Sequence, residues 1–356
     1  MQKQIAVFHN NKNFCYYLEK KLNSFHWKFY KNFNEFKEQN CNLKFCVFFD
    51  ENYEQNFDRL SFYENLKKNS QAVLSICPEP KIYNFIKDTI NEHDNCLYFV
   101  NGMINSLSDN ENVISCIWWF NKVTDFYKNL DFNYFEDMTP YMQKDFYFDF
   151  LPGIPKKERL HIANLIENSN CKEKIFLAPF FNSENWQDVV VNYHDYCFWE
   201  KGIELITNNY NRCKFFGQEI PVSVIIPKKI YNKTSYSIVT ETVNDFDQVF
   251  ISEKTAKAIL AKRLFVMFGS RYQLKTLHKL GFKTFDGIID ERYDEVFVQE
   301  ERILSAFQQV EKLCELPQKE ILEKIRPIVE HNYNLLINYN FYDIIVEKIL
   351  EKIHNF

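Results

Sequence analysis

Apolar strands alternate with helical segments along the first 140 residues, and this order limits the folds open to the chain. Strands are predicted at 4–8, 27–30, 43–49 and 72–76, and helices around 14–22, 58–68 and 82–90. Such alternation favours a mostly parallel sheet with helices on both faces. We therefore expect a Rossmann-like α/β domain at residues 1–140.

The same alternation returns after an irregular aromatic segment at 113–139, which we interpret as a linker or domain crossing. Strands are predicted at 146–150, 174–181, 236–239 and 264–268, and helices at 156–166 and 196–205. We expect a second Rossmann-like domain at residues 141–316. Helical periodicity at 299–316 and 341–353 predicts a helical C-terminal part, with residues 317–356 packing back on the domains.

Composition excludes several common classes of function. The chain has only 7 Gly and neither a G-x-G-x-x-G nor a G-x-x-x-x-G-K-[ST] motif, which disfavours nicotinamide enzymes and P-loop ATPases. A net charge of −5 provides no global basic field for a polyanion. The 10 cysteines are scattered without a C-x-x-C pair, which argues against zinc modules and a disulfide framework.

The N-terminus lacks a signal-peptide pattern, and no apolar run reaches the roughly 20 residues that a membrane helix needs. Singly placed cysteines fit a reducing compartment. The sequence therefore predicts a cytoplasmic protein without a membrane span, in a bacterial or virus-infected cell.

Residues 236–270 carry the strongest candidate site. A strand ends in Thr240-Glu241, a helix opens with Ser252-Glu253-Lys254-Thr255, and a second strand stops at Gly269. A helix N-terminus with a lysine suits a phosphate, and the glutamates suit sugar hydroxyls. The alternative interpretation is a plain helix cap at Ser252, with Glu253 placed favourably for the helix dipole.

This block resembles the donor-binding motif of the alpha-1,3-fucosyltransferases and of related phage and giant-virus glycosyltransferase-like proteins. Glu241, Ser252-Glu253-Lys254 and Gly269-Ser270 fall on that pattern in order. The resemblance implies a GT-B-like fold, with two Rossmann-like domains facing across a cleft. It also implies inverting transfer of a sugar from a nucleotide-diphosphate sugar to an acceptor hydroxyl, without a cofactor.

Two further residues match the family by position. Glu79, in Cys77-Pro78-Glu79-Pro80, lies in a loop where the family carries its catalytic base, although an exposed glutamate in a turn is an equal alternative. Arg159 opens a helix in a pattern that resembles the viral relatives, in which the arginine neutralises diphosphate charge. The alternative for Arg159 is membership of a solvated basic patch.

Asp245-Phe246-Asp247 has the D-x-D spacing of metal-dependent transferases, but it does not end an apolar strand. We therefore expect no required metal. The donor is expected to be GDP- or UDP-linked, and the acceptor a glycan or another hydroxyl compound.

Two alternatives for the function stay open at this stage. One is a phage-type DNA glycosyltransferase acting on a hydroxymethylated base, with modified DNA as its partner, which would need a basic, aromatic-lined groove. The other is a non-catalytic binding module with a transferase-like fold, which would be expected to lose Glu79, Lys254 or Arg159; all three are present.

Overall fold

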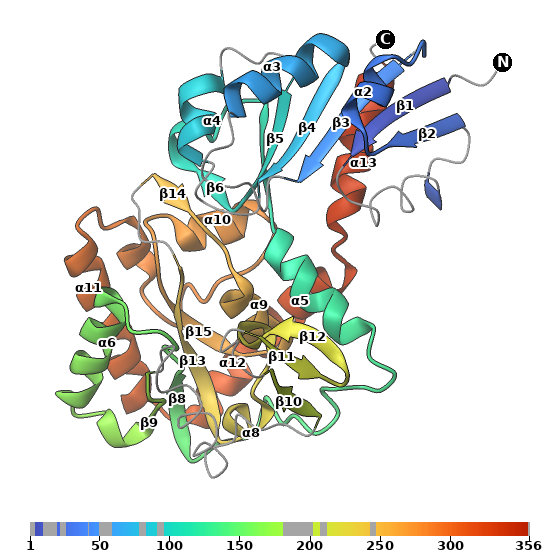
Figure 1. Cartoon of the computed structure of the whole chain (residues 1–356). Helices are drawn as coiled ribbons and strands as arrows, with labels where there is room; N and C mark the ends of the chain where they lie inside the picture. Colours follow the sequence, from blue (N-terminus) through green and yellow to red (C-terminus); the bar gives the residue numbers. More distant parts are fainter. Residues whose placement is uncertain are drawn as a thin grey trace. The chain divides into compact units, whose positions relative to one another are not determined.

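The structure is a computed structural model (Figure 1), and it describes residues 4–9, 20–21, 26–41, 43–49, 59–77, 83–90, 96–180, 202–206, 212–242 and 247–354. The chain divides into two compact units. Unit 1 comprises Met1–Trp118 with Asn340–Phe356, and unit 2 comprises Trp119–Tyr339. The domain limits expected from the sequence at residues 140 and 316 stay a prediction.

Unit 1 is built on a six-stranded sheet with the order β2-β1-β3-β4-β5-β7, in which all neighbours run parallel. Its strands are β1 (Gln4–His9), β2 (His26–Tyr30), β3 (Leu43–Phe49), β4 (Ala72–Cys77), β5 (Cys96–Asn101) and β7 (Val113–Cys116), and the short β6 is Met103–Ile104. The predicted parallel α/β architecture is confirmed. β5 and β7 were not predicted from the sequence; β7 has four residues, of which only Cys116 is buried, so its apolar signal is weak.

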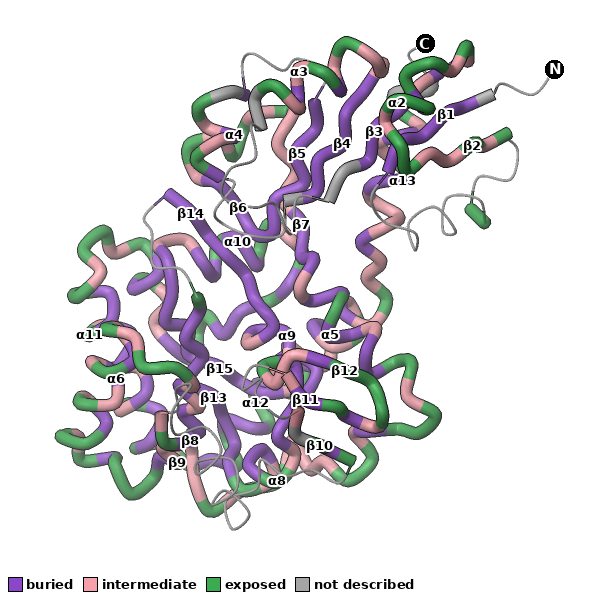
Figure 2. The backbone as a smooth tube through the Cα atoms, in the orientation of Figure 1, coloured by how far each residue is buried: buried purple, intermediate pink, exposed green. Residues whose placement is uncertain are grey.

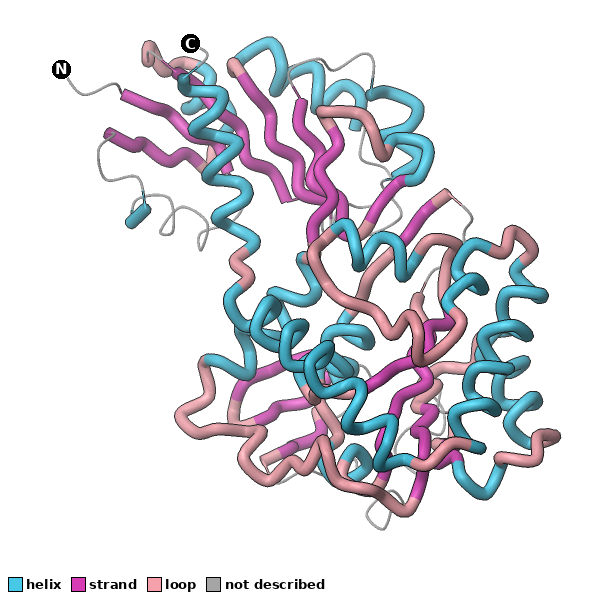
Figure 3. Tube along the Cα trace, turned by 180° about the vertical axis from the view of Figure 1, so that it is seen from behind, coloured by secondary structure: helices cyan, strands magenta, loops and turns pink. Residues whose placement is uncertain are grey.

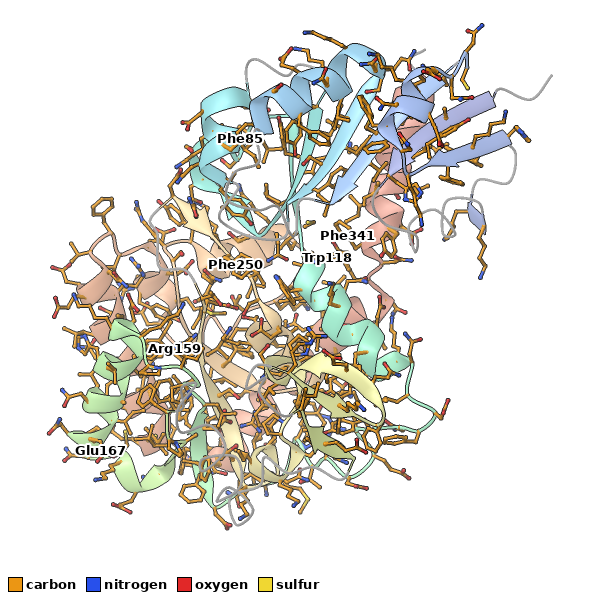
Figure 4. All side chains as sticks on the ribbon, in the orientation of Figure 1. Phe85, Trp118, Arg159, Glu167, Phe250 and Phe341 are labelled. Carbon is orange, nitrogen blue, oxygen red and sulfur yellow. The ribbon has the colours of Figure 1, made fainter. Side chains whose placement is uncertain are left out.

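Helices of unit 1 include α2 (Phe33–Lys37), α3 (Arg59–Asn69), α4 (Tyr83–Thr89) and α13 (Phe341–His354). The last of these comes from the C-terminal end of the chain. The Phe341 ring packs edge-on against Trp118, at a centroid distance of 5.0 Å (Figure 4). It also packs edge-on against Phe99, at a centroid distance of 6.4 Å. Most of the helix predicted at 14–22 lies outside the described residues.

Unit 2 contains a four-stranded parallel sheet with the order β15-β13-β8-β9. Its strands are β8 (Phe146–Phe150), β9 (Ile175–Leu177), β13 (Thr234–Thr240) and β15 (Leu264–Phe268). Every residue of β13 and β15 is buried (Figure 2). These two strands are therefore the core around which the unit is organised.

Several helices lie beside the strands of unit 2, as the view from behind shows (Figure 3). They are α5 (Trp118–Lys128), α6 (Lys157–Glu167), α8 (Lys228–Tyr231), α9 (Glu253–Leu260), α10 (Gln273–Lys279), α11 (Gln299–Glu315) and α12 (Gln318–Asn338). The boundary between the two units follows Trp118, inside the segment 113–139 that was interpreted as a linker or domain crossing. The segment is not irregular throughout, because β7 and α5 lie there. In the described part of the chain, no helix is both long and apolar enough to cross a membrane.

Unit 2 also carries a small antiparallel sheet of β10 (Ile203–Leu205), β11 (Arg212–Phe215) and β12 (Gln218–Pro221). The helix predicted at 196–205 is wrong at its described end, because residues 203–205 form β10. Antiparallel pairing with Cys213 and Phe215 decides the conformation there, and local periodicity cannot reveal such non-local pairing.

A buried ion pair holds the sheet of unit 2 together, and we call it the Asp149–Arg263 cluster. Arg263 donates to Asp149 Oδ2 at 2.6 Å, to Ser237 Oγ at 2.9 Å and to the Thr234 carbonyl at 2.7 Å. The side chains of Asp149 and Arg263 are each 3% exposed. The carbonyls of Tyr231 and Tyr236 also accept from this guanidinium, which leaves each of its three nitrogens with a partner.

Candidate functional site

The sequence-predicted residues of unit 2 meet at one edge of its parallel sheet. β8, β13 and β15 end side by side, and the segments that follow them carry Arg159, Glu241 and Gly269. The backbone N–H of Glu241 donates to the Phe268 carbonyl at 2.9 Å, which ties the ends of β13 and β15 together. Ligands of open α/β sheets bind at this carboxyl edge.

Glu241 is almost completely buried, with 2% of its surface exposed. Its Oε1 accepts hydrogen bonds from the backbone N–H of Ser252 at 3.1 Å and from the Thr255 hydroxyl at 2.6 Å. Its Oε2 is also buried but has no hydrogen-bond partner. A buried carboxylate oxygen without a partner costs free energy, so it calls for an explanation.

Ser252 is the N-cap of α9, as the capping interpretation predicted, and its hydroxyl accepts from the Lys254 backbone N–H. Since Glu241 already accepts from the Ser252 N–H, two donors at this helix end are used by the protein itself. A phosphate at this place would therefore be bound mainly by side chains. The assignment of Ser252 and Thr255 to donor binding stays a prediction.

The Lys254 ammonium lies above the start of α9. It donates to Glu253 Oε1 at 2.8 Å, to the Ser252 hydroxyl at 3.2 Å and to the Thr242 hydroxyl at 3.1 Å. Glu253 is 7% exposed, and burial raises the pKa of its carboxyl, but Lys254 outweighs burial and the pKa lies below its ordinary value. The Glu253 carboxyl is therefore ionised at neutral pH.

Arg159 lies in the first turn of α6 (Figure 4) and is 6% exposed. Its Nη1 donates to the carbonyls of Pro152 at 2.8 Å and Ile154 at 3.1 Å. Its Nε is buried without a partner. Burial lowers the pKa of this guanidinium, and the nearby carboxylates, with Glu241 the strongest, oppose that shift. Arg159 is thus a cation whose Nη1 is fixed by two backbone carbonyls and whose buried Nε has no hydrogen-bond partner.

Arg159 and Glu241 line the same small pocket, which is partly open to solvent and has a cavity volume of about 10 Å³. The other lining residues are Lys156, Glu158, Ile162, Thr240, Phe268 and Ile303. Although their charges are opposite, Arg159 and Glu241 form no ion pair with each other among the described residues. The pocket is therefore lined by a guanidinium and a carboxylate, each of which has a buried polar atom without a hydrogen-bond partner.

Two cations that the sequence analysis did not assign also belong here. Lys156 donates to the Thr242 carbonyl at 3.1 Å, and the pKa of its ammonium is lowered by burial first and then by Arg159. Burial lowers the pKa of Lys257 to about 8, although the carboxylate of Glu253 opposes that shift. The position of Lys257 in α9, four residues or about one helical turn after Glu253, was the sequence signal that could have identified it.

Gly269 provides room for this arrangement. A β-carbon at this position would lie 3.1 Å from Gln273 Oε1 and 3.3 Å from the Cβ of Glu241. The Gly269 carbonyl accepts from Arg302 Nε at 3.1 Å. Gln273, which the sequence analysis did not single out, is fully buried and donates its amide to the Phe250 carbonyl at 2.6 Å.

Some predicted residues cannot be placed at this site. Glu79 and Asp245 lie outside the described residues, while Asp247 is buried in unit 2. In the described ranges, no group of three or more His, Cys, Asp or Glu side chains could hold a metal ion. Glu79 as a base and Asp245 as a metal ligand therefore stay untested.

Comparisons with known proteins give little further guidance. No protein-family model matches the chain, and no curated protein matches it. Among solved structures, the chain is similar to T4 phage beta-glucosyltransferase, with 12% identity and a TM-score of 0.32, over 94% of this chain and 100% of that one. A likeness at this level establishes neither a common fold nor a common activity.

Proposed function

We propose that this protein is a glycosyltransferase and that unit 2 binds a nucleotide-diphosphate sugar at the carboxyl edge of its parallel sheet. The observation that carries the proposal is the pair of unused buried atoms, Arg159 Nε and Glu241 Oε2, on residues of one pocket. One is a donor on a cation and the other is an acceptor on an anion. A ligand that satisfies both must combine a hydrogen-bond acceptor with a hydroxyl or amine hydrogen, and beside a guanidinium a negatively charged oxygen is the strongest acceptor.

A nucleotide-diphosphate sugar combines these groups in one molecule. Its phosphate oxygens would accept from Arg159 and from the ammonium of Lys156, and a sugar hydroxyl would donate to Glu241. The Lys254 ammonium would exchange one of its three hydrogen bonds to the protein for one to the phosphate. The pocket itself is small, so it would hold only the part of the donor nearest these groups. Glu253, next to Lys254, would keep that ammonium in place.

The proposed reaction forms a bond between the acceptor oxygen and the anomeric carbon of the sugar. The bond from that carbon to the diphosphate breaks, and the electron pair leaves with the diphosphate. Arg159, Lys156 and Lys254 would stabilise the negative charge that develops there, because cations already held in place need no reorganisation at the moment of reaction. The proton of the acceptor hydroxyl passes to a base, for which Glu79 is our proposal from the sequence.

A ligand panel tests the donor class. Thermal unfolding is measured with GDP, UDP, CDP and dTDP, each compared with its nucleoside, because a ligand bound only by the native state raises stability by mass action. We expect at least one diphosphate, and not its nucleoside, to raise the unfolding temperature. Equal or absent shifts for all compounds would contradict the proposed donor class.

Transfer itself needs a separate measurement. Release of the free nucleoside diphosphate from its sugar conjugate is followed in the presence of glycan acceptors and of DNA containing a hydroxymethylated base. Acceptor-dependent release would support the enzyme and identify the acceptor class. Donor binding without release for any acceptor would instead favour a non-catalytic binding module.

A further inference from the structure

Four side chains of unit 2 form a row in which aromatic rings alternate with cations, and we call it the cation–aromatic row. The Arg271 guanidinium lies 5.8 Å from the centre of the Phe297 ring and 4.4 Å from the centre of the Tyr272 ring. The Lys275 ammonium lies 4.8 Å from the centre of the same Tyr272 ring. The order in space is therefore Phe297, Arg271, Tyr272 and Lys275.

The row is assembled from segments that lie apart in the sequence. Arg271 and Tyr272 follow β15, Lys275 belongs to α10, and Phe297 precedes α11. The short 3-10 helix η6 (Glu291–Glu295) contacts both α10 and α11 and so brings these segments together. The row is therefore a product of tertiary structure.

The cation–aromatic row is joined to the candidate site through Gly269. Arg302 of α11 donates from Nε to the Gly269 carbonyl at 3.1 Å and from Nη1 to the carbonyls of Val296 at 2.8 Å and Phe297 at 3.3 Å. Gly269 in turn packs against Glu241. A ligand on the row would thus lie beside the carboxyl edge of the sheet.

The backbone under the row is fixed in an unusual conformation. Tyr272 has a φ of 68°, in the left-handed region that non-glycine residues seldom adopt. Its N–H donates to the Asp294 carbonyl at 2.9 Å, and its own carbonyl accepts from the Thr276 N–H at 2.9 Å. The Asp294 carboxylate accepts from the N–H groups of Leu274 at 3.0 Å and Lys275 at 3.1 Å. The row is therefore held in place before any ligand binds.

The cations of the row keep donors that the protein does not use. Arg271 Nε donates to the Glu295 carbonyl at 2.8 Å. Among the residues that the structure describes, Arg271 and Lys275 have no ion-pair partner. The Phe297 side chain is 63% exposed. Two cations and a large ring are thus presented together at the surface.

A ligand that matches this row must alternate negative charges with flat apolar groups. A single nucleic-acid strand does so, because each nucleotide carries one phosphate and one base. Proteins that bind single strands combine cations along the backbone with aromatic side chains on which unpaired bases stack. The net charge of −5 leaves such binding to a local surface of this kind.

We propose that the cation–aromatic row binds single-stranded nucleic acid. Arg271 and Lys275 contact phosphates of the strand, and an unpaired base stacks on Phe297. That this strand is the acceptor of the sugar rests on the proposed function, whereas the binding does not.

Fluorescence anisotropy with the full chain tests the binding. The probe is a labelled oligothymidylate, and an abasic strand of the same length is the matched probe without bases. The variants are Phe297→Ala and the double variant Arg271→Gln/Lys275→Gln. Their matched controls are Phe132→Ala, which removes another exposed ring, and Arg212→Gln, which removes an exposed cation. Circular dichroism checks that each variant folds.

We expect the two sets of variants to differ in kind. Phe297→Ala should weaken binding of the oligothymidylate by about 5- to 150-fold, with an unchanged salt dependence. The double variant should lower the slope of log affinity against log salt by about 1.4, because two phosphate contacts are lost. The abasic strand should bind the wild type about as weakly as the intact strand binds Phe297→Ala. Both controls should bind like the wild type.

Three results would overturn the proposal. The first is absence of wild-type binding at low salt, and the second is equal binding of the abasic and intact strands, which would indicate a surface for any polyanion. The third is a loss of nucleotide-diphosphate affinity in Phe297→Ala, which would assign the ring to the base of the donor. Strand binding that persists while no nucleotide diphosphate binds would contradict the proposed function alone.

Discussion

Two clusters in unit 2 combine a buried arginine with a buried carboxylate, and they differ in how completely their hydrogen bonds are satisfied. In the Asp149–Arg263 cluster, each nitrogen of the guanidinium has a partner. In the cluster of Arg159 and Glu241, one donor and one acceptor remain unused, and the two charges do not pair.

This difference separates a structural role from a binding role. Burial of polar groups without partners is costly, so native structures retain few of them. The satisfied cluster lies within the sheet, where Asp149 and Ser237 belong to β8 and β13. The unsatisfied cluster lies beyond the strand ends, at the wall of a small pocket. We therefore propose a structural role for the first cluster and ligand binding for the second.

The largest effect is expected from a change outside both clusters, and it tests whether Glu241 binds the donor or acts as the base. Glu79→Gln keeps the size of the side chain but cannot accept a proton, so transfer should slow by about 10²–10⁴-fold at nearly constant donor affinity. Glu241→Gln is the matched variant and should weaken donor binding. Steady-state kinetics and calorimetry of both variants separate these outcomes. If Glu79→Gln turns over normally, while Glu241→Gln loses turnover but still binds the donor, the base is Glu241.

The second effect is on the unfolding free energy, and it tests directly whether the two clusters differ in their structural role. Arg263→Met leaves the Asp149 carboxylate buried and uncompensated, so unfolding free energy should fall by about 3–5 kcal/mol. Arg159→Met removes two hydrogen bonds to carbonyls, and its loss should be about 1–2 kcal/mol. Denaturant unfolding of both variants measures the difference. Equal losses would show that both clusters are structural.

The sequence predicted the strands and the helix cap that depend on a local pattern of residues. Apolar runs located β3, β4, β13 and β15, and Ser252 was identified as a possible cap from its place before a helical segment. The antiparallel β10–β12 sheet escaped prediction because its pairing is non-local.

The hydrogen bonds at the site could not be predicted in the same way. Arg159 and Glu241 were singled out by resemblance, but whether Nε and Oε2 find partners depends on side-chain rotamers and on backbone carbonyls of other segments.

A third, smaller effect is that Lys257, near the binding cluster, makes both the unfolding free energy and the donor affinity depend on pH. Lys257 has a folded pKa of about 8, below its ordinary value of 10.5, so the unfolded chain binds more protons between these values. Its contribution to unfolding free energy therefore rises with pH through that window. Donor affinity should change in the opposite sense, falling a few-fold as pH rises through about 8, because one nearby positive charge is lost. Calorimetry between pH 7 and 9 measures this fall, and Lys257→Met should remove it. An unchanged profile in that variant would show that Lys257 does not act on the ligand.

Metal removal should produce the smallest effect. The cations Lys156, Arg159 and Lys254 supply the positive charge that a diphosphate leaving group requires, so activity should survive EDTA. The check is a transfer assay after dialysis against EDTA and again after addition of manganese. If EDTA abolishes the transfer activity and manganese restores it, the reaction requires a metal ion, and Asp245 and Asp247 become the candidate ligands.

The central claim is that the Arg159 cluster holds the diphosphate of the donor, and calorimetric titration tests it most directly. The diphosphate identified by the ligand panel is titrated into the wild type, Arg159→Gln and Lys254→Ala, with Arg212→Gln and Lys172→Ala as matched controls on exposed ion pairs. Loss of one charge-assisted contact should weaken binding by about 1.5–3 kcal/mol, or about 10- to 100-fold, in the first two variants only. Unchanged affinity in both Arg159→Gln and Lys254→Ala, with the fold intact, would contradict the account.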